Sequence, residues 1–416
     1  MHFSTVLARS PAGLLSYISG FSKRYQDHVL LFALSPNVAS SDLALLVQKL
    51  TRFSSRTIGC LSAPLPANSD GLISCSFAIF EPETCIPFRS QIPGRVFPQV
   101  GRWHSFRQKG PQSKILEEDV PSGNVDWGSV WDQSLTSNAL PPELENLRPD
   151  DIGTIIYLSD PAPEGLSNTL ARFPGASKLG LFAASTPFIT GRPVTLFQGE
   201  NIYDSGAVGL ALRNPKARAG VQFLGMKPIS PPMVVTQAEG NLIVSLDKKN
   251  PTKLLLAAIQ NAGLESNGPD TLKDNDEFSL ATMSAGEPHQ MCNIMSGDPS
   301  RGTMALRSMS APPIGAQVQF FHRPKSTTPT IPEGFTHSSD SRHILGFLAC
   351  TETRQYTHAS ATEEVSGGIA HIFHNVFLAG SEGGFISSRS QDGSSEAPWS
   401  CTIPGGLASL SWPIEP

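Results

Sequence analysis

Cys350 is the residue whose type and position are best suited to chemistry. It ends the apolar segment 344–350, and Arg354 follows four residues later. A nearby cation lowers the pKa of a thiol and makes the thiolate a nucleophile. The alternative is a structural residue, because free cysteines are among the most buried residue types. Cys350 and Arg354 are therefore candidates for a reactive or ligand-binding pair, and a Cys-dependent enzyme is one alternative for the function.

Glu382 lies in a glycine-rich stretch near the end of the chain. Gly380 precedes it, and two glycines follow it directly. Glycines let a backbone approach a ligand closely, and the carboxylate could hold a ligand amine. An ordinary glycine turn is the alternative. Gly380 and Glu382 are thus candidate ligand-binding residues.

Two other patterns contain residue types that bind metals. His371 and His374 fall within a predicted helix whose apolar stripe runs through Val365, Ile369 and Val376, so both histidines face solvent. A metal would also need a third ligand, and Glu363 or His358 would have to fold onto that outer face. The acidic run 274–277 lacks the glycine and the distant glutamate of a calcium loop. We expect no metal site and no cofactor.

The sequence contains no G-x-S-x-G, no G-x-x-x-x-G-K-[ST] and no H-E-x-x-H motif. The common hydrolase, nucleotide-binding and zinc-protease signatures are therefore missing. We assign no catalytic residue, and the pattern favours a binding protein over an enzyme.

Short apolar runs alternate with helical stretches in the first half of the chain. The run 28–34 predicts a strand buried on both faces, and a helix with Ser40 or Ser41 at its start should follow it. Further strands are predicted at 57–61, 72–80, 152–158 and 178–183, with a short helix at 166–173. We expect an α/β to α+β fold of mixed sheets with flanking helices, in two packed halves.

Antiparallel elements are predicted further along the chain. Strand 205–212 precedes a hairpin of 233–237 with 242–246, and a helix at 252–262 ends at Gly263. Strands at 303–309, 316–322 and 344–350 come before the helix of Val365 to Val376 and a glycine-rich end.

Composition suggests where the chain divides. The polar, Pro-rich stretch 101–150 predicts a loop-rich insertion with Trp103, Trp127 and Trp131 as anchors, and 263–302 predicts a polar connector. We expect one region formed by 1–100 and 151–262, and a second region at 303–416.

Charge and cysteine usage narrow the function classes. A formal net charge of -5 without a basic block argues against nucleic acid as a partner. The apolar run 29–34 is far shorter than the roughly 20 residues of a membrane span. Six scattered cysteines without a C-x-x-C pair favour free thiols in a reducing compartment.

The first 26 residues contain no acidic residue, which is a property of mitochondrial presequences. The spacing of Leu14, Ile18, Phe21 and Tyr25 favours an amphipathic helix of the mature protein instead. We expect an intracellular, cytoplasmic protein, with the mitochondrion as the alternative.

Several of these segments resemble the FIST family, named for F-box and intracellular signal transduction proteins. LLFALSP, DLALLVQKL and TIGCLSA are similar to its N-terminal strand, helix and glycine-cysteine step, and SGAVGLAL followed by GMKPISPPMVVTQAEGNLIVSLD is similar to its central stretch. GFLACTETRQ and LAGSEGGFI resemble its C-terminal region, with Cys350 at the cysteine position. Ser230 stands where the family often has glycine between prolines.

The resemblance implies a non-catalytic sensory or scaffold module in intracellular signalling. It would bind a small polar ligand, which in bacterial members is thought to be an amino acid, or a protein partner. Pro228 and Ser230 lie in GMKPISPP, whose prolines fix a loop, and join Cys350, Glu382 and their neighbours as candidates in a cleft between the halves.

Eukaryotic FIST proteins can follow an F-box in ubiquitin ligase receptors, and the helical sequence of an F-box does not precede the FIST-like segments here. We therefore expect FIST regions without an F-box. An adaptor that works with ubiquitin ligase components in protein degradation is the alternative, on family analogy alone.

Overall fold

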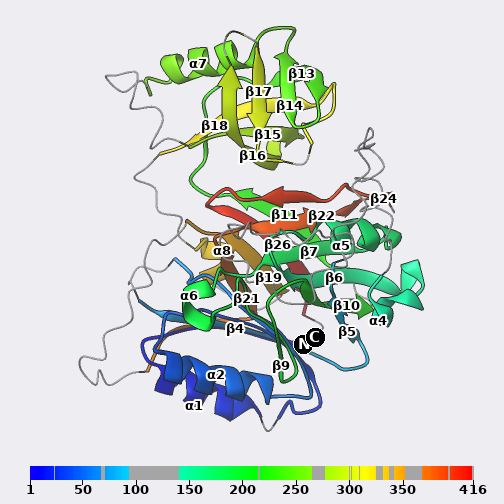
Figure 1. Cartoon of the computed structure of the whole chain (residues 1–416), viewed down its shortest axis with the longest axis vertical. Helices are drawn as coiled ribbons and strands as arrows, with labels where there is room; N and C mark the ends of the chain where they lie inside the picture. The colour runs from blue at the N-terminus through cyan, green and yellow to red at the C-terminus, as the bar shows by residue number, and fades with distance from the viewer. Residues whose placement is uncertain are drawn as a thin grey trace, which may run out of the picture.

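The computed structural model describes residues 1–22, 24–66, 71–92, 140–213, 216–264, 277–298, 300, 302–308, 310–324, 331–336, 342–351, 368–391 and 394–414. Three mixed sheets with helices on their outer faces form the larger part, called here the body (Figure 1). A smaller unit of strands and one helix lies at the top of Figure 1. The expected mixed α+β fold is confirmed.

The three sheets of the body contain the same four-stranded topology. In each, the second and third strands are parallel, and the fourth strand lies antiparallel between the second and the first. Repeat 1 comprises β1 (His2–Ala8), β2 (Val29–Leu34), β3 (Arg56–Leu61) and β4 (Ile73–Phe80). Repeat 2 comprises β5 (Cys85–Ser90), β6 (Ile152–Ser159), β7 (Ser177–Phe182) and β10 (Ala207–Arg213). Repeat 3 comprises β11 (Arg218–Phe223), β19 (Arg342–Ala349), β21 (Val376–Ser381) and β26 (Gly406–Pro413).

Repeat 1 shows why the sequence folds this way. All six residues of β2 are buried, because the core covers one face of the strand and helices cover the other. Helix α2 (Ser40–Thr51) makes the crossover to the parallel strand β3 and turns Leu43, Leu46 and Leu50 toward the sheet. Its N-cap residue is Ala39, which makes no side-chain cap, so the predicted capping by Ser40 or Ser41 is wrong.

Strands outside the repeats extend the sheets. The short strands β8 (Leu196–Gln198) and β9 (Asn201–Tyr203) lengthen the first sheet beyond β3. The C-terminal part of the chain adds β20 (Ile369–His374) beside β1, and β22 (Phe385–Ser388) and β25 (Trp399–Cys401) beside β7. The last third of the chain therefore joins all three sheets.

The inner faces of the three sheets share one apolar core. Leu31 of repeat 1, Leu158 of repeat 2 and Phe347 of repeat 3 all belong to the same buried cluster. The rings of Phe3 and Trp412 meet edge to face at 5.8 Å between centroids and connect repeat 1 to repeat 3. Burying each such side chain stabilises the fold by about 1.5 to 3 kcal/mol.

Each outer face has its own smaller cluster. Helices α1 (Pro11–Ser22) and α2 cover the first sheet, at the bottom of Figure 1. The other short helical segments are α4 (Pro142–Glu145), η2 (Pro149–Asp151), α5 (Glu164–Thr169), η3 (Leu170–Arg172), α6 (Pro187–Thr190) and α8 (Glu333–Thr336). Among the described helices, none is long and apolar enough to span a membrane.

The smaller unit, called here the ring unit, is inserted between the first and second strands of repeat 3. It comprises β12 (Lys227–Pro228), β13 (Met233–Glu239), β14 (Leu242–Leu246), α7 (Pro251–Asn261), β15 (Glu277–Ser284), β16 (Glu287–Asp298), β17 (Thr303–Leu306) and β18 (Gln317–Arg323). The antiparallel order β18-β13-β14-β17-β16-β15 returns to β18, so the sheet closes on itself. Helix α7 covers it, with Leu255, Ala258 and Ile259 in its core.

An apolar contact joins the ring unit to the body. Ala281, Met291 and Phe321 of the ring unit belong to the same cluster as Trp399 and the inner faces of the three sheets. A polar contact between β16 and the segment before β25 lies at this boundary.

Most predicted elements are confirmed, including the hairpin of β13 with β14 and the helix that ends before Gly263. The predicted helix through Val365, Ile369 and Val376 is wrong, because its described part forms β20 and β21 around Asn375, which has a φ of 60°. Asparagine tolerates this left-handed turn, and a short apolar stretch does not by periodicity distinguish a strand from a helix.

Two other segments differ from expectation. Residues 263–302 were predicted as a connector, yet β15 and β16 of the ring unit lie there, because Glu277–Asp298 form a long hairpin. Of the predicted insertion 101–150, residues 101–139 and all three of its tryptophans lie outside the described residues, and α4 and η2 follow.

Candidate functional site

The carboxyl ends of the third strands of the three repeats meet at one place, called here the strand-end junction. Ala184 N donates to Leu61 O (3.0 Å), Ala63 N donates to Gly380 O (2.9 Å), and Phe182 N donates to Gly384 O (3.1 Å). Each repeat is thereby bonded to both others. Crevices outside the carboxyl ends of strands are common ligand sites in open α/β sheets, so this junction is the first place to consider.

Buried polar side chains lie around the junction, and their hydrogen bonds explain them. Ser35 follows β2 and accepts a hydrogen bond from Ser74 N (2.8 Å). Asp160 follows β6 at the equivalent position and accepts from Ala162 N (3.0 Å) and Gly206 N (2.5 Å). Repeats 1 and 2 thus use the same device, in which a polar residue after the second strand holds the start of the fourth.

Cys350 lies beside the junction but has the surroundings of a structural residue. It is 9% exposed and belongs to an apolar cluster with Leu348 and Leu378. Burial, together with the charge of Glu382, raises the pKa of its thiol to about 12. Sγ lies 3.6 Å from Leu348 O and 4.0 Å from Pro64 O, and a backbone hydrogen bond from Ser381 offsets only part of the rise. This environment does not favour a nucleophilic thiol, and Arg354, its predicted partner, lies outside the described residues.

Gly380 and Glu382 lie next to Cys350. A Cβ on Gly380 would lie 2.9 Å from both Ala63 O and Cys350 Sγ, so the glycine is needed for the close approach of two repeats. Glu382 is half-buried on the turn that leads to Gly384. Its charge acts on Cys350 and contributes to the raised pKa of that thiol.

Pro228 and Ser230 lie in the ring unit instead. Pro228 is exposed in β12, which pairs with β18. Ser230 Oγ accepts from Phe320 N (3.1 Å), and its carbonyl accepts from Gln319 Nε2 (2.6 Å). These contacts bind the proline-containing segment to β18, so the predicted site residues fall into two separate groups.

The two histidines face solvent, as predicted, but for a different structural reason. His371 and His374 are both exposed, although they lie on a strand and not on a helix. No group of three metal-ligand side chains occurs among the described residues. The acidic run 274–276 is outside them.

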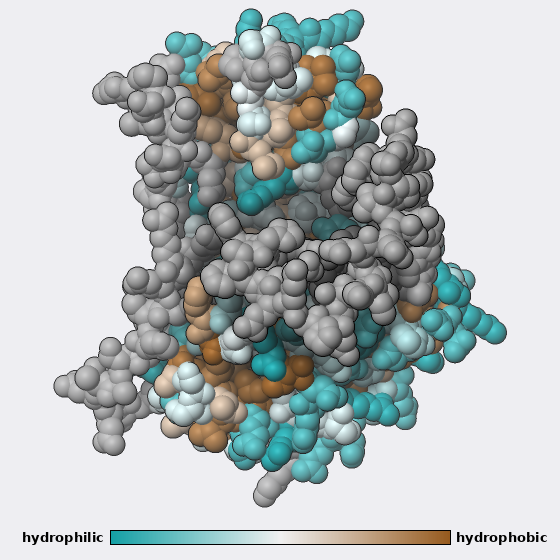
Figure 2. All heavy atoms as spheres, in the orientation of Figure 1, coloured by the Kyte–Doolittle hydropathy of each residue, from teal (hydrophilic) through white to brown (hydrophobic). Residues whose placement is uncertain are grey.

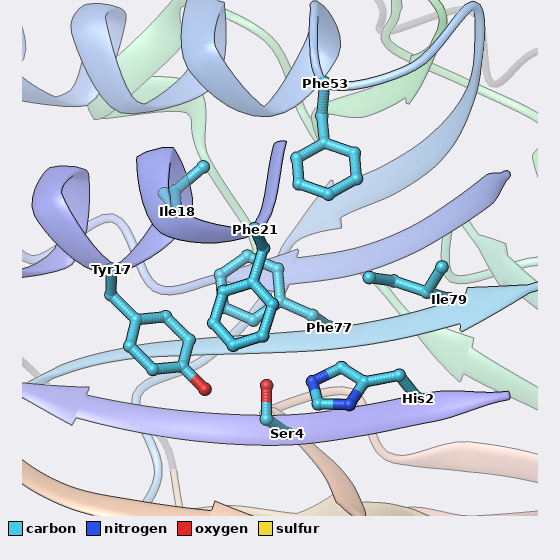
Figure 3. Close-up of a pocket in the computed structure, with 8 residues that line it drawn as sticks. All are labelled: His2, Ser4, Tyr17, Ile18, Phe21, Phe53, Phe77 and Ile79. Atoms are coloured by element: carbon cyan, nitrogen blue, oxygen red, sulfur yellow. The ribbon is translucent and has the colours of Figure 1, made fainter. Parts of the chain in front are cut away.

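A small recess that the sequence did not reveal lies between α1 and the first sheet (Figure 3). His2 and Ser4 of β1 lie opposite Ile79 and Phe77 of β4 and form its floor, and side chains of α1 cover them. Figure 3 shows the hydroxyls of Tyr17 and Ser4 and the imidazole of His2 turned toward the same space. Its free volume of about 10 Å³ is enough for one water molecule.

The polar groups of this recess are neutral near pH 7. Burial raises the pKa of Tyr17. Burial, with the charges of His374, the N-terminal amino group and Arg24, lowers the pKa of His2. Within the described part of the chain, His2 Nε2 has no hydrogen-bond partner, and Tyr17 Oη has none of normal geometry, although the nearby Ser4 hydroxyl offsets part of the rise in the pKa of Tyr17.

The fold and its junction define a mixed α+β protein of three repeats with an inserted ring unit. A family model described as the FIST N domain matches residues 27–249, from β2 through β14. The match spans more than half of the chain, which therefore belongs to the FIST family. FIST domains are sensory domains of signalling proteins, so the chain is a signalling module. A search of curated proteins found no match.

We predict that Cys350 resists alkylation in the native protein. Its buried thiol has a pKa of about 12, whereas Cys292 is partly exposed. Iodoacetamide at pH 7.5, with mass spectrometric mapping over time, should modify Cys292 first and Cys350 only after unfolding. Faster labelling of Cys350 than of Cys292 would restore the case for a reactive thiol.

A matched pair of tyrosine variants tests the recess. Tyr17→Phe removes a hydroxyl that forms no hydrogen bond of normal geometry among the described residues and should change the free energy of unfolding by less than about 0.5 kcal/mol. Tyr157→Phe removes a buried hydroxyl that lies 3.0 Å from Ser167 Oγ and should lower it by about 1 to 2 kcal/mol. Urea denaturation measures both. Equal losses of unfolding free energy in the two variants would mean that a bound molecule in the recess forms a hydrogen bond with the Tyr17 hydroxyl.

Proposed function

We propose that this chain is a sensory module that binds a small polar ligand beside Glu382 at the strand-end junction. The observation that carries the proposal is the half-buried residue Glu382 on a glycine turn, where the third strands of all three repeats end. A carboxylate next to backbone that lacks side chains suits a ligand amine, such as that of an amino acid.

The recess of Figure 3 is too small to be the site of such a ligand. Ligand sites have volumes of roughly 300 to 1,000 Å³, whereas the recess offers about 10 Å³. An amino acid would have to displace α1 to enter it. In the proposed site beside Glu382, Cys350 and Gly380 form the inner wall. Arg354 is a proposed further contact of the ligand there.

The proposal includes a cytoplasmic location. All six cysteines are free, and five of them are buried. Free thiols are typical of reducing compartments. The same observation supports a role in intracellular signalling.

A thermal-shift screen with amino acids and small metabolites tests the proposal. A ligand at one hundred times its Kd should stabilise the native protein by about 2.7 kcal/mol. Glu382→Gln should remove this shift because it removes the charge that holds the amine. Glu239→Gln, at an exposed hairpin turn of the ring unit, is the matched control and should retain it.

The screen contradicts the proposal if ligands shift wild type and Glu382→Gln equally. If no small molecule shifts the wild type, pull-down with mass spectrometry tests the protein-partner form of the function. Capture of one partner by the wild type and not by Glu382→Gln would place that partner at the same turn.

A further inference from the structure

The polar contact where the ring unit meets the body contains charged groups. Glu396 of the body precedes β25, and its Oε1 accepts hydrogen bonds from two adjacent residues of β16, with His289 Nε2 at 2.7 Å and Gln290 Nε2. Arg389 Nη2 donates to the carbonyl of His289 (3.0 Å), and its Nε lies 3.9 Å from Glu396 Oε2. One carboxylate is thus surrounded by an imidazole, an amide and a guanidinium.

The backbone fixes the acid and the arginine on the body side. Glu396 N donates to Arg389 O (2.8 Å), and Ser388 Oγ donates to Glu396 O (2.6 Å). Arg389 and Glu396 flank the short pairing of β23 (Ser390–Gln391) with β24 (Ser394–Ser395). Arg389 and Glu396 are therefore fixed at the open end of this hairpin. His289 and Gln290 of the ring unit supply the other donors to the Glu396 carboxylate.

Glu396 uses this donor set incompletely. An arginine that binds a carboxylate through two parallel hydrogen bonds places its nitrogens at about 2.7 to 2.9 Å from the oxygens. Arg389 Nε is buried, forms no hydrogen bond in the described structure and lies well beyond that distance from the carboxylate. Arg389 is therefore positioned to bind a carboxylate more closely than it binds that of Glu396.

The electrostatics of the contact favour an anion. Burial alone would raise the pKa of Glu396, but the hydrogen bonds of His289 and Gln290 and the charges of His289 and Arg389 together lower it. The carboxylate is ionised at neutral pH. The side chains of His289 and Glu396 are 20% and 21% exposed, so solvent and small solutes reach them.

We propose that His289, Gln290 and Arg389 form a carboxylate-binding site that Glu396 fills from within the chain, and that a small carboxylate ligand competes with Glu396 for it. Displacement of Glu396 breaks its hydrogen bonds to β16 and leaves the apolar contact around Met291 and Trp399 to hold the ring unit. The contact thus couples an anionic ligand to the attachment of the ring unit. This inference is independent of the site at Glu382.

Chemical rescue tests the site. Glu396→Ala should lower the midpoint of thermal unfolding, and propionate should restore most of the loss with saturation, because it supplies the missing carboxylate. Propionamide, of the same shape without charge, should not restore it. Glu239→Ala, which lies outside the contact, is the control and should show no specific response to propionate. Equal effects of propionate and propionamide on Glu396→Ala would overturn the proposal.

Competition in the wild type tests the coupling. Propionate should increase hydrogen exchange of the β16 amides in the wild type and leave exchange in the first sheet unchanged. Glu396→Gln keeps the shape of the side chain and removes its charge. Propionate should alter β16 exchange less in this variant than in the wild type, because the variant has no carboxylate for propionate to displace. No change in β16 exchange in the wild type at saturating propionate would show that the carboxylate does not compete.

Discussion

Three backbone hydrogen bonds between the ends of the third strands are the constraint on which the body of this protein depends. They connect repeat 1 to repeat 2, repeat 1 to repeat 3 and repeat 2 to repeat 3 at a single end of the shared core. Buried backbone N–H and C=O groups need hydrogen-bond partners, so these bonds fix the distance between the sheets at their strand ends. Gly380 of repeat 3 shows how tight the closure is, because a Cβ there would lie 2.9 Å from Ala63 O, which follows the third strand of repeat 1.

Once the strand ends are fixed, the positions of the core, the helices and the residues at the junction follow. The inner faces of the sheets are held around one apolar core, and the outer faces remain for helices. Cys350 and Gly380 become packing residues of the closure, whereas Glu382 is left on its outer edge. In this FIST module the ring unit is joined to the body by the apolar cluster around Met291 and Trp399 and by a separate polar contact.

The sequence predicted the elements better than it predicted their assembly. Continuous apolar runs such as 29–34 identify strands because burial on both faces leaves no room for polar residues. The sequence showed alternating strands and helices but not the threefold repeat, because long segments separate the first and second strands of repeats 2 and 3. The predicted helix near His371 failed because Ile and Phe at short spacing suit both a helix and an edge strand.

The candidate site was predicted in part for a similar reason. Glycines around a glutamate indicated a turn, and Cys350 and Glu382 do lie together. No local pattern could indicate that Pro228 and Ser230 belong to another unit, since that depends on pairing with β18, about 90 residues away in sequence. The polar contact of Glu396 joins residues about 107 positions apart and has no local signature either.

Native-state hydrogen exchange of the amides of Ala63, Phe182 and Ala184 tests the central claim most directly. If the strand-end junction holds the three repeats together, all three amides should exchange only through global unfolding, with one common free energy of opening. Exchange of any of them by local opening at a much lower free energy, while amides of β2 and β6 stay protected, would show that the repeats cohere without the junction.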